Sequence, residues 1–236
     1  MTVEEEKQIV NNVTDARARI AEAARKAGRK PEDIILVAAT KMNDAERVRA
    51  AVRAGIDVCG ENRVQELLGK YEEHAYDGCP LHFIGTLQSN KVKYLMGKVS
   101  MIESVSSVKL ATVIAKEAKK AGLCQDILLE INIGREEAKL GLDPDEVFEA
   151  VQTISRMDNI CIRGLMAIPP KLDESRKDTY YFDRMHQLFV DISDKKYDNV
   201  FMDYLSMGMS ADFEAAISCG ANIVRLGTTI FGARHY

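Results

Sequence analysis

Short apolar runs alternate with longer amphipathic stretches along the whole chain. Residues 3–27 carry Ile9, Val13 and Ile20 at helical spacing, and Gly28 follows as a stop signal. Residues 34–39 then form a short apolar run that is typical of a buried strand. The same alternation repeats up to the last residues of the chain, so the pattern predicts repeated strand–helix units.

The pattern predicts eight strands and eight helices in total. The expected strands are residues 34–39, 56–59, 81–84, 99–103, 127–131, 160–167, 200–205 and 222–226. The expected helices are residues 3–27, 44–54, 62–74, 89–96, 106–121, 143–156, 174–194 and 211–218. Eight short apolar strands alternating with helices favour an α/β fold of the (β/α)8 TIM barrel type. An open doubly wound sheet is the alternative.

The order of the elements is unusual for a barrel, because the chain begins with a helix and only residues 228–236 follow the last expected strand. We expect the first helix to fill the place that a final helix would take. No Pro-rich linker, charge block or low-complexity segment divides the sequence, so we expect a single domain over residues 1–236.

Composition excludes several classes of protein. The formal net charge of −4 disfavours a protein that coats nucleic acid. No apolar stretch reaches the roughly 18–20 residues needed to span a bilayer, and the acidic N-terminus lacks the pattern of a signal peptide. The five cysteines form no CxxC pair and the four histidines are far apart, so we expect reduced thiols, no metal site and a cytoplasmic location.

Lys41 is the sharpest chemical signal, because it follows the first apolar run and the chemistry of a barrel sits at the carboxyl ends of its strands. We expect its side chain to project into the barrel mouth. Burial there would lower the pKa of the amine and let it form a Schiff base with a carbonyl compound. The alternative is a lysine at a strand end whose ammonium group simply reaches solvent.

Two loops form the second signal. Residues 206–210 follow the seventh strand with two hydroxyls and a glycine, and residues 225–228 follow the eighth with a guanidinium, a glycine and a hydroxyl. The phosphate site of many barrels is built from these two loops, although the glycines can also serve only as turns. A reactive lysine beside a phosphate site suits pyridoxal 5'-phosphate (PLP) or a phosphorylated sugar handled by a lysine aldolase, and the pattern does not separate them.

Seven stretches of the chain resemble one known family, the pyridoxal phosphate homeostasis proteins. They run from end to end in order: LVAATK (36–41), GENRVQE (60–66), HFIGTLQSNK (82–91), INIGREEAKLGL (131–142), RGLMAI (163–168), LSMGMSADFEAAI (205–217) and VRLGTTIFGAR (224–234). The resemblance implies a barrel similar to the N-terminal domain of alanine racemase. It also implies a protein that binds and distributes PLP, with PLP-dependent apo-enzymes as recipients. We expect a monomer, because the sequence lacks the dimerising domain of the racemases.

The resemblance further implies a set of cofactor-binding residues. Lys41 would hold PLP as a Schiff base, Arg225 would meet the pyridine nitrogen, and Asn62 would face the ring. The remaining residues would cradle the phosphate (Ser210, Gly227 and Thr228) or pack near the ring (Met207 and Met209).

Three polar residues bear further on function. Arg225 has no acceptor for a pyridinium proton, so it predicts a weak electron sink, and we expect a cofactor carrier with no catalytic residue rather than an enzyme. A PLP-dependent racemase of low activity is the alternative; it would need a second base, which alanine racemases take from a separate domain. We interpret Glu61 as a charge at a helix N-terminus rather than a residue that orients Asn62. His82 is expected to be a satisfied core histidine.

Overall fold

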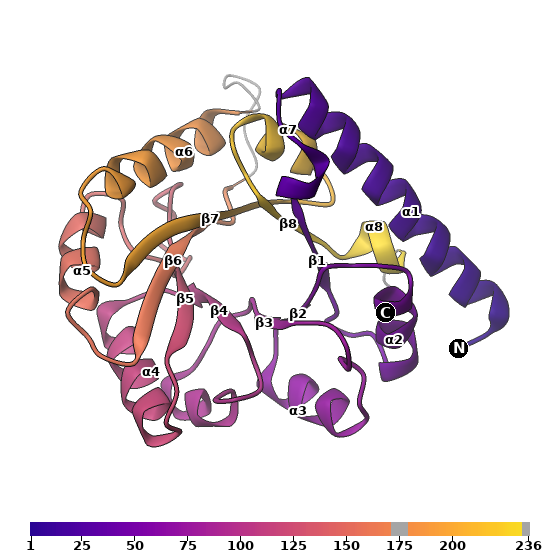
Figure 1. Cartoon of the computed structure of the whole chain (residues 1–236), viewed down its shortest axis with the longest axis horizontal. Coiled ribbons are helices and arrows are strands. Elements are labelled where there is room, and N and C mark those ends of the chain that lie inside the picture. Colours follow the sequence, from indigo (N-terminus) through magenta and orange to yellow (C-terminus); the bar gives the residue numbers. More distant parts are fainter. Residues whose placement is uncertain (171–178, 233–236) are drawn as a thin grey trace.

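The computed structural model describes residues 1–170 and 179–232, and its centre is a closed barrel of parallel strands (Figure 1). Each strand pairs with the next in the chain, and β8 pairs with β1 to close the ring. The strands are β1 (Ile35–Ala39), β2 (Val58–Glu61), β3 (Leu81–Phe83), β4 (Met101–Val105), β5 (Gln125–Glu130), β6 (Ile160–Met166), β7 (Val200–Met209) and β8 (Ile223–Leu226). The predicted (β/α)8 barrel is confirmed, and the open sheet is excluded.

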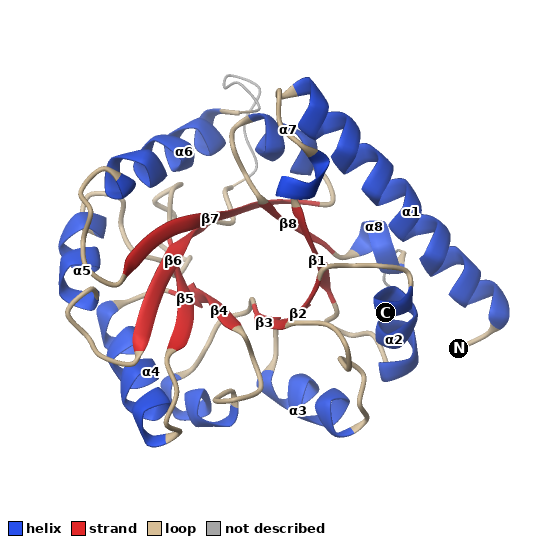
Figure 2. Cartoon of the chain, in the orientation of Figure 1, coloured by secondary structure: helices blue, strands red, loops and turns tan. Residues whose placement is uncertain are grey.

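Helices form a layer outside the barrel (Figure 2). They are α1 (Val3–Lys26), α2 (Ala45–Arg53), α3 (Val64–Glu72), α4 (Val108–Lys120), α5 (Val147–Ile154), α6 (Tyr180–Ser193), α7 (Phe213–Ser218) and α8 (Thr228–Phe231), with 3₁₀ helices η1 (Pro31–Asp33) and η2 (Ser89–Tyr94). The helix expected over 89–96 is therefore the 3₁₀ helix η2. The start of the helix expected over 174–194 lies outside the described residues.

Helix α1 closes the outer layer where a barrel normally has its last helix. A capping box between Thr2 and Glu5 begins the helix, and its buried face carries Ile9, Val13 and Ile20. This face packs against α2, α7 and the four-residue α8 (Figure 1). The expected role of the first helix is confirmed.

Strand β7 differs most from expectation. It was expected to end at residue 205, but it continues to Met209, so residues 206–209 are strand rather than loop. The pairing with β8 shifts register between Ser206 and Met209. Gly208 makes this irregularity possible, because its φ is +92° and a Cβ there would lie 2.6 Å from the Cβ of Ala216.

The inside of the barrel changes from apolar to polar along the strands. One layer of buried side chains is apolar: Val37, Val58, Met101, Leu128, Met166 and Ile223. Because side chains alternate between the two faces of a strand, the residue two positions further along also faces inward. That position is Glu103 on β4, Glu130 on β5 and Arg225 on β8, so ionisable groups gather toward the mouth.

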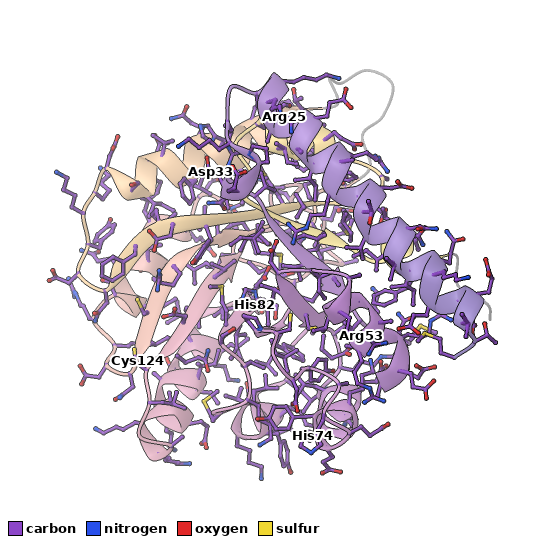
Figure 3. All side chains as sticks on the ribbon, turned by 45° about the vertical axis from the view of Figure 1, so that its right-hand side comes forward. Arg25, Asp33, Arg53, His74, His82 and Cys124 are labelled. Carbon is purple, nitrogen blue, oxygen red and sulfur yellow. The ribbon has the colours of Figure 1, made fainter. Side chains whose placement is uncertain are left out.

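Arg25, Arg53 and His74 are exposed on the outside of the molecule, whereas His82 lies among the strands (Figure 3). Within residues 1–170 and 179–232, no group of three or more His, Cys, Asp or Glu side chains is arranged to hold a metal ion. No helix in this part of the chain has the length and apolar character needed to cross a bilayer.

Candidate functional site

Lys41 sits in a tight turn that directly follows β1. Before it, the Thr40 amide donates to the carbonyl of Gly60 at 2.8 Å. After it, Met42 adopts a φ of +61°, which non-glycine residues rarely do, and its amide donates to Oε2 of Glu66 at 2.8 Å. Asn43 Nδ2 donates to the Lys41 carbonyl at 3.1 Å. The backbone that carries the lysine is thus fixed on both sides.

A buried ion pair lies behind this turn. Glu61 is fully buried, and its Oε2 accepts from Lys70 Nζ at 2.7 Å and from Thr40 Oγ1 at 2.9 Å. Lys70 also donates to the Thr40 carbonyl at 2.8 Å, and Glu61 Oε1 accepts from the Asn62 amide at 2.7 Å. The interpretation of Glu61 as a helix-terminus charge was therefore wrong: it orients Asn62 and braces the residue next to Lys41.

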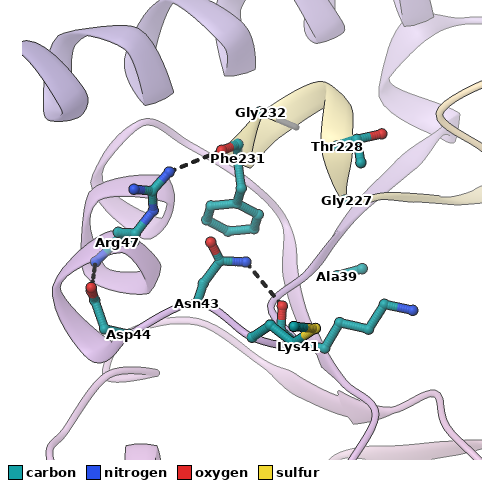
Figure 4. A pocket seen from close by; sticks show the side chains of 10 residues that line it. Ala39, Lys41, Asn43, Asp44, Arg47, Gly227, Thr228, Phe231 and Gly232 are labelled. Carbon is teal, nitrogen blue, oxygen red and sulfur yellow. Dashed lines mark hydrogen bonds between the residues drawn. The ribbon is translucent and has the colours of Figure 1, made fainter. Parts of the chain in front are cut away.

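A cavity of about 260 Å³ opens beside Lys41 at the carboxyl ends of β1 and β8. Gly227 and Thr228 also line this cavity, together with Arg47 and Phe231. Figure 4 shows the Lys41 side chain extending away from Asn43 and Arg47. The lysine and the loop after β8, which are far apart in sequence, meet here as predicted.

The two loops predicted to hold a phosphate are joined directly. Ser210 Oγ accepts from the amides of Gly227 and Thr229, both at 3.3 Å. The bonds join the end of β7 to the first turn of α8 and occupy two of the amides of that turn. Gly227 lines the cavity, and a Cβ there would make an ordinary van der Waals contact, 3.6 Å from the Cβ of Ala39.

Arg225 lies inside the barrel with only 4% of its surface exposed. Its Nη1 donates to Ser206 Oγ at 2.5 Å, and its Nη2 donates to the carbonyl of Ala167 at 2.9 Å. Burial lowers the pKa of the Arg225 guanidinium, while the carboxylates of Glu103 and Glu130 work against that shift. The group stays a cation because its ordinary pKa is so high.

Two carboxyl groups near Arg225 titrate differently. Burial works to raise the pKa of Glu103, but hydrogen bonds and charges from His82, Arg225 and Ser206 outweigh it and lower the pKa. Burial raises the pKa of Glu130 to about 7, which Arg225 offsets only in part. Glu103 is thus the fixed counter-charge of Arg225, and Glu130 can exchange a proton near neutral pH.

Asn62 carries a buried acceptor without a partner. Its Oδ1 atom is buried and accepts no hydrogen bond from the described residues. The backbone of Asn62 is held in place by Gly85, where a Cβ would lie 2.1 Å from the Asn62 carbonyl oxygen. Buried amide oxygens without a donor are uncommon in folded proteins, so Asn62 is a candidate for contact with a ligand.

The structure does not bring Met207 to the mouth. Its side chain is fully buried in the large cluster between the barrel and the helices. Ser206 faces inward, so its neighbour Met207 faces outward. Met209, which pairs with Arg225 in the sheet, is 38% exposed instead.

Sequence reasoning missed two residues of the site. Glu103 was not singled out, although it stands two positions after the apolar Met101, which places it on the inner face. Lys70 occupies the apolar face of its helix, three positions after Leu67, which signals burial with a partner. His82 was correctly expected to be a satisfied core histidine, since its Nδ1 lies 2.7 Å from Glu103 Oε1.

The cavity therefore brings together the primary amine of Lys41, Gly227 and the hydroxyl of Thr228, whereas Arg225, Asn62 and Ser210 are not among its lining residues. This set suits a small ligand that carries a carbonyl group and an anionic group. The amine can form a Schiff base with the carbonyl, and the Thr228 hydroxyl can donate to the anion.

Known proteins share this architecture. Residues 9–235 match the family described as alanine racemase, N-terminal domain. The pyridoxal phosphate homeostasis protein of Aquifex aeolicus is 44% identical over 218 residues, which cover 92% of this chain and 95% of that protein. The crystal structure of an unknown protein from Bifidobacterium adolescentis has a TM-score of 0.90 at 35% identity, with 98% of this chain and 97% of that chain covered. PipY of Synechococcus elongatus, solved with PLP bound, has a TM-score of 0.78 at 30% identity, with 90% and 100% covered.

Proposed function

Because the chain belongs to the pyridoxal phosphate homeostasis proteins, within the family of the alanine racemase N-terminal domain, we propose that it binds PLP as a Schiff base on Lys41 and serves vitamin B6 homeostasis in the cell. The observation that carries this proposal is one cavity lined by the Lys41 side chain, Gly227 and Thr228. A relative of this fold, PipY, was solved with PLP bound.

The residues of the mouth fit such a cofactor. Gly227, which has no side chain, and the Thr228 hydroxyl line the cavity and suit a phosphate, and the orphaned Oδ1 of Asn62 suits a donor near the ring. PLP supplies an aldehyde that condenses with a primary amine. Lys41 offers that amine from a braced turn, and Ser210 holds the phosphate loop in shape.

Arg225 favours a carrier over an enzyme. Its guanidinium can donate to a ring nitrogen but cannot keep that nitrogen protonated, because it has no acceptor. A protonated ring nitrogen is the usual electron sink in PLP chemistry, so carbanion chemistry is weak here. Delivery of the cofactor to PLP-dependent apo-enzymes, a single domain, a monomeric state and a cytoplasmic location complete the proposal.

Borohydride reduction tests the proposal. Protein incubated with PLP and then reduced should carry the cofactor on Lys41, as mapped by peptide mass spectrometry, and Lys41→Ala should lose it. Lys139→Ala is the control, because Lys139 lies in the loop after β5 and pairs with Glu136; it should keep the label on Lys41. Unlabelled wild-type protein would refute the proposal. Exchange of the Cα hydrogen of an amino acid for deuterium, lost in Lys41→Ala, would favour the racemase alternative.

A further inference from the structure

A line of hydrogen bonds crosses the barrel behind Arg225. Ser206 Oγ receives the Arg225 Nη1 proton at 2.5 Å and donates its own to Glu103 Oε2 at 2.6 Å. The other oxygen of Glu103, Oε1, accepts from His82 Nδ1 at 2.7 Å. The four residues come from β8, β7, β4 and β3, and none is more than 6% exposed.

We propose that Ser206, Glu103 and His82 are positioning residues for Arg225, which fix its guanidinium for contact with the cofactor ring. The proposal rests on the proposed function, since it assigns how the same site is held. It adds three residues that do not reach the cavity beside Lys41 and act through Arg225.

The geometry fixes the guanidinium at two points. Nη1 is held by Ser206 and Nη2 by the carbonyl of Ala167 at 2.9 Å. A guanidinium has five N–H donors in a rigid plane, so two contacts set its orientation and leave the other donors for a ligand. Without Ser206, Nη1 would have no fixed acceptor.

Charge explains why a carboxylate completes the line. A buried cation needs a counter-charge, and Glu103 Oε2 lies 3.9 Å from Arg225 Nη1. Each oxygen of Glu103 receives one donor, from Ser206 and from His82, so the carboxylate is satisfied as well as paired. Fully satisfied buried networks are rigid, which a positioning role requires.

His82 marks the far end of the line. It lines a second cavity, of about 710 Å³, at the amino-terminal ends of the strands, together with Asp126 and Tyr204. Six of the eight strands fill the barrel interior with an apolar side chain, whereas β3 contributes His82. A polar side chain at this place is explained by the Nδ1–H that it gives to Glu103.

The test compares two buried serines. Ser206→Ala removes the Arg225 contact, whereas Ser104→Ala removes a buried hydroxyl that donates to Gly85 O at 2.5 Å on the same sheet. PLP affinity, measured by absorbance titration, should fall about tenfold in Ser206→Ala. It should stay within about twofold of wild type in Ser104→Ala. Equal affinities in the two variants would overturn the proposal.

A second measurement needs no cofactor. In ligand-free protein, NMR should show slow hydrogen exchange at the Arg225 guanidinium, about tenfold faster exchange in Ser206→Ala, and no change in Ser104→Ala. Glu103→Gln and His82→Phe should also speed the exchange, and a residue whose variant leaves it unchanged is not a positioning residue. If wild-type protein takes up no PLP, the proposed function fails, while this measurement still decides whether Ser206, Glu103 and His82 hold Arg225.

Discussion

The Nζ atom of Lys70 lies 2.7 Å from Oε2 of Glu61, and both side chains are buried beneath the turn that carries Lys41. Lys70 comes from α3, and Glu61 is the last residue of β2. The pair therefore ties a helix to the ends of two strands, because Lys70 also donates to the carbonyl of Thr40 after β1. Loss of this ion pair would therefore lower the stability of the fold and disturb the turn that carries Lys41.

Lys70→Met should destabilise the protein strongly, because it leaves the Glu61 carboxylate buried without its partner. Breaking such a pair costs about 3–5 kcal/mol of unfolding free energy, which urea denaturation measures. Lys26→Met is the matched control, because Lys26 pairs with Glu22 at 2.6 Å on the exposed face of α1. That change should leave stability nearly unchanged. Similar losses in the two variants would contradict the burial argument.

Glu130→Gln should stabilise the protein above neutral pH. Burial raises the pKa of Glu130 from an ordinary 4.5 to about 7, so between these values the folded protein holds a proton that the unfolded chain releases. Stability therefore falls as pH rises from 4.5 to 7, by about 3 kcal/mol in total, and glutamine removes that loss.

Urea denaturation at pH 5 and pH 8 checks whether the stability gained from Glu130→Gln increases with pH. The gain from Glu130→Gln should be larger at pH 8, and Glu149→Gln, on the exposed face of α5, should show no such difference. An equal gain from Glu130→Gln at the two pH values would show that the carboxyl group does not titrate in this range.

Gly227→Ala should separate binding from folding. A Cβ at Gly227 meets only ordinary contacts, 3.6 Å from the Cβ of Ala39, so unfolding free energy should change by no more than about 0.5 kcal/mol. The same methyl group would occupy the space that a phosphate needs, and PLP affinity should fall about tenfold or more.

Gly85→Ala provides the opposite case. Its Cβ would lie 2.1 Å from the Asn62 carbonyl oxygen, so this variant should lose about 1–3 kcal/mol of stability. Thermal unfolding and absorbance titration on the two variants distinguish the roles. A Gly227→Ala protein that binds PLP as wild type does would exclude Gly227 from the phosphate site.

The barrel could be predicted from the sequence because the spacing of apolar residues and the segment lengths distinguish strands from helices. Short apolar runs, such as residues 34–39, alternate with amphipathic helices. The extension of β7 could not be predicted, because Gly208 indicates a turn unless the shifted pairing with β8 is known. The outward position of Met207 depends on that same register.

The sequence also could not predict which buried charged residues pair with one another. Glu61 was interpreted as a charge at a helix N-terminus because its partner, Lys70, is identified only when α3 packs against β2. Glu103 and Ser206 lie 103 positions apart, and only closure of the barrel brings them together. Sequence pattern tells which face a residue occupies, whereas the pairing of charges across the barrel requires its geometry.

Asn62→Ala should lower the thermal stability of the ligand-free protein only slightly and that of the PLP-bound protein more. Its buried Oδ1 has no donor among the described residues, and such an unsatisfied atom lowers the free energy of unfolding by about 1–3 kcal/mol. Removing the amide therefore offsets part of the stability that is lost with its packing contacts. Asn43→Ala is the control at the same mouth, since its Nδ2 already donates to the Lys41 carbonyl at 3.1 Å. Thermal unfolding with and without PLP should show a reduced cofactor-induced shift for Asn62→Ala. Asn43→Ala should instead lower the midpoint in both states. If Asn62→Ala lowers the thermal unfolding midpoint of the ligand-free protein as much as Asn43→Ala does, then Asn62 is a structural residue and does not bind a ligand.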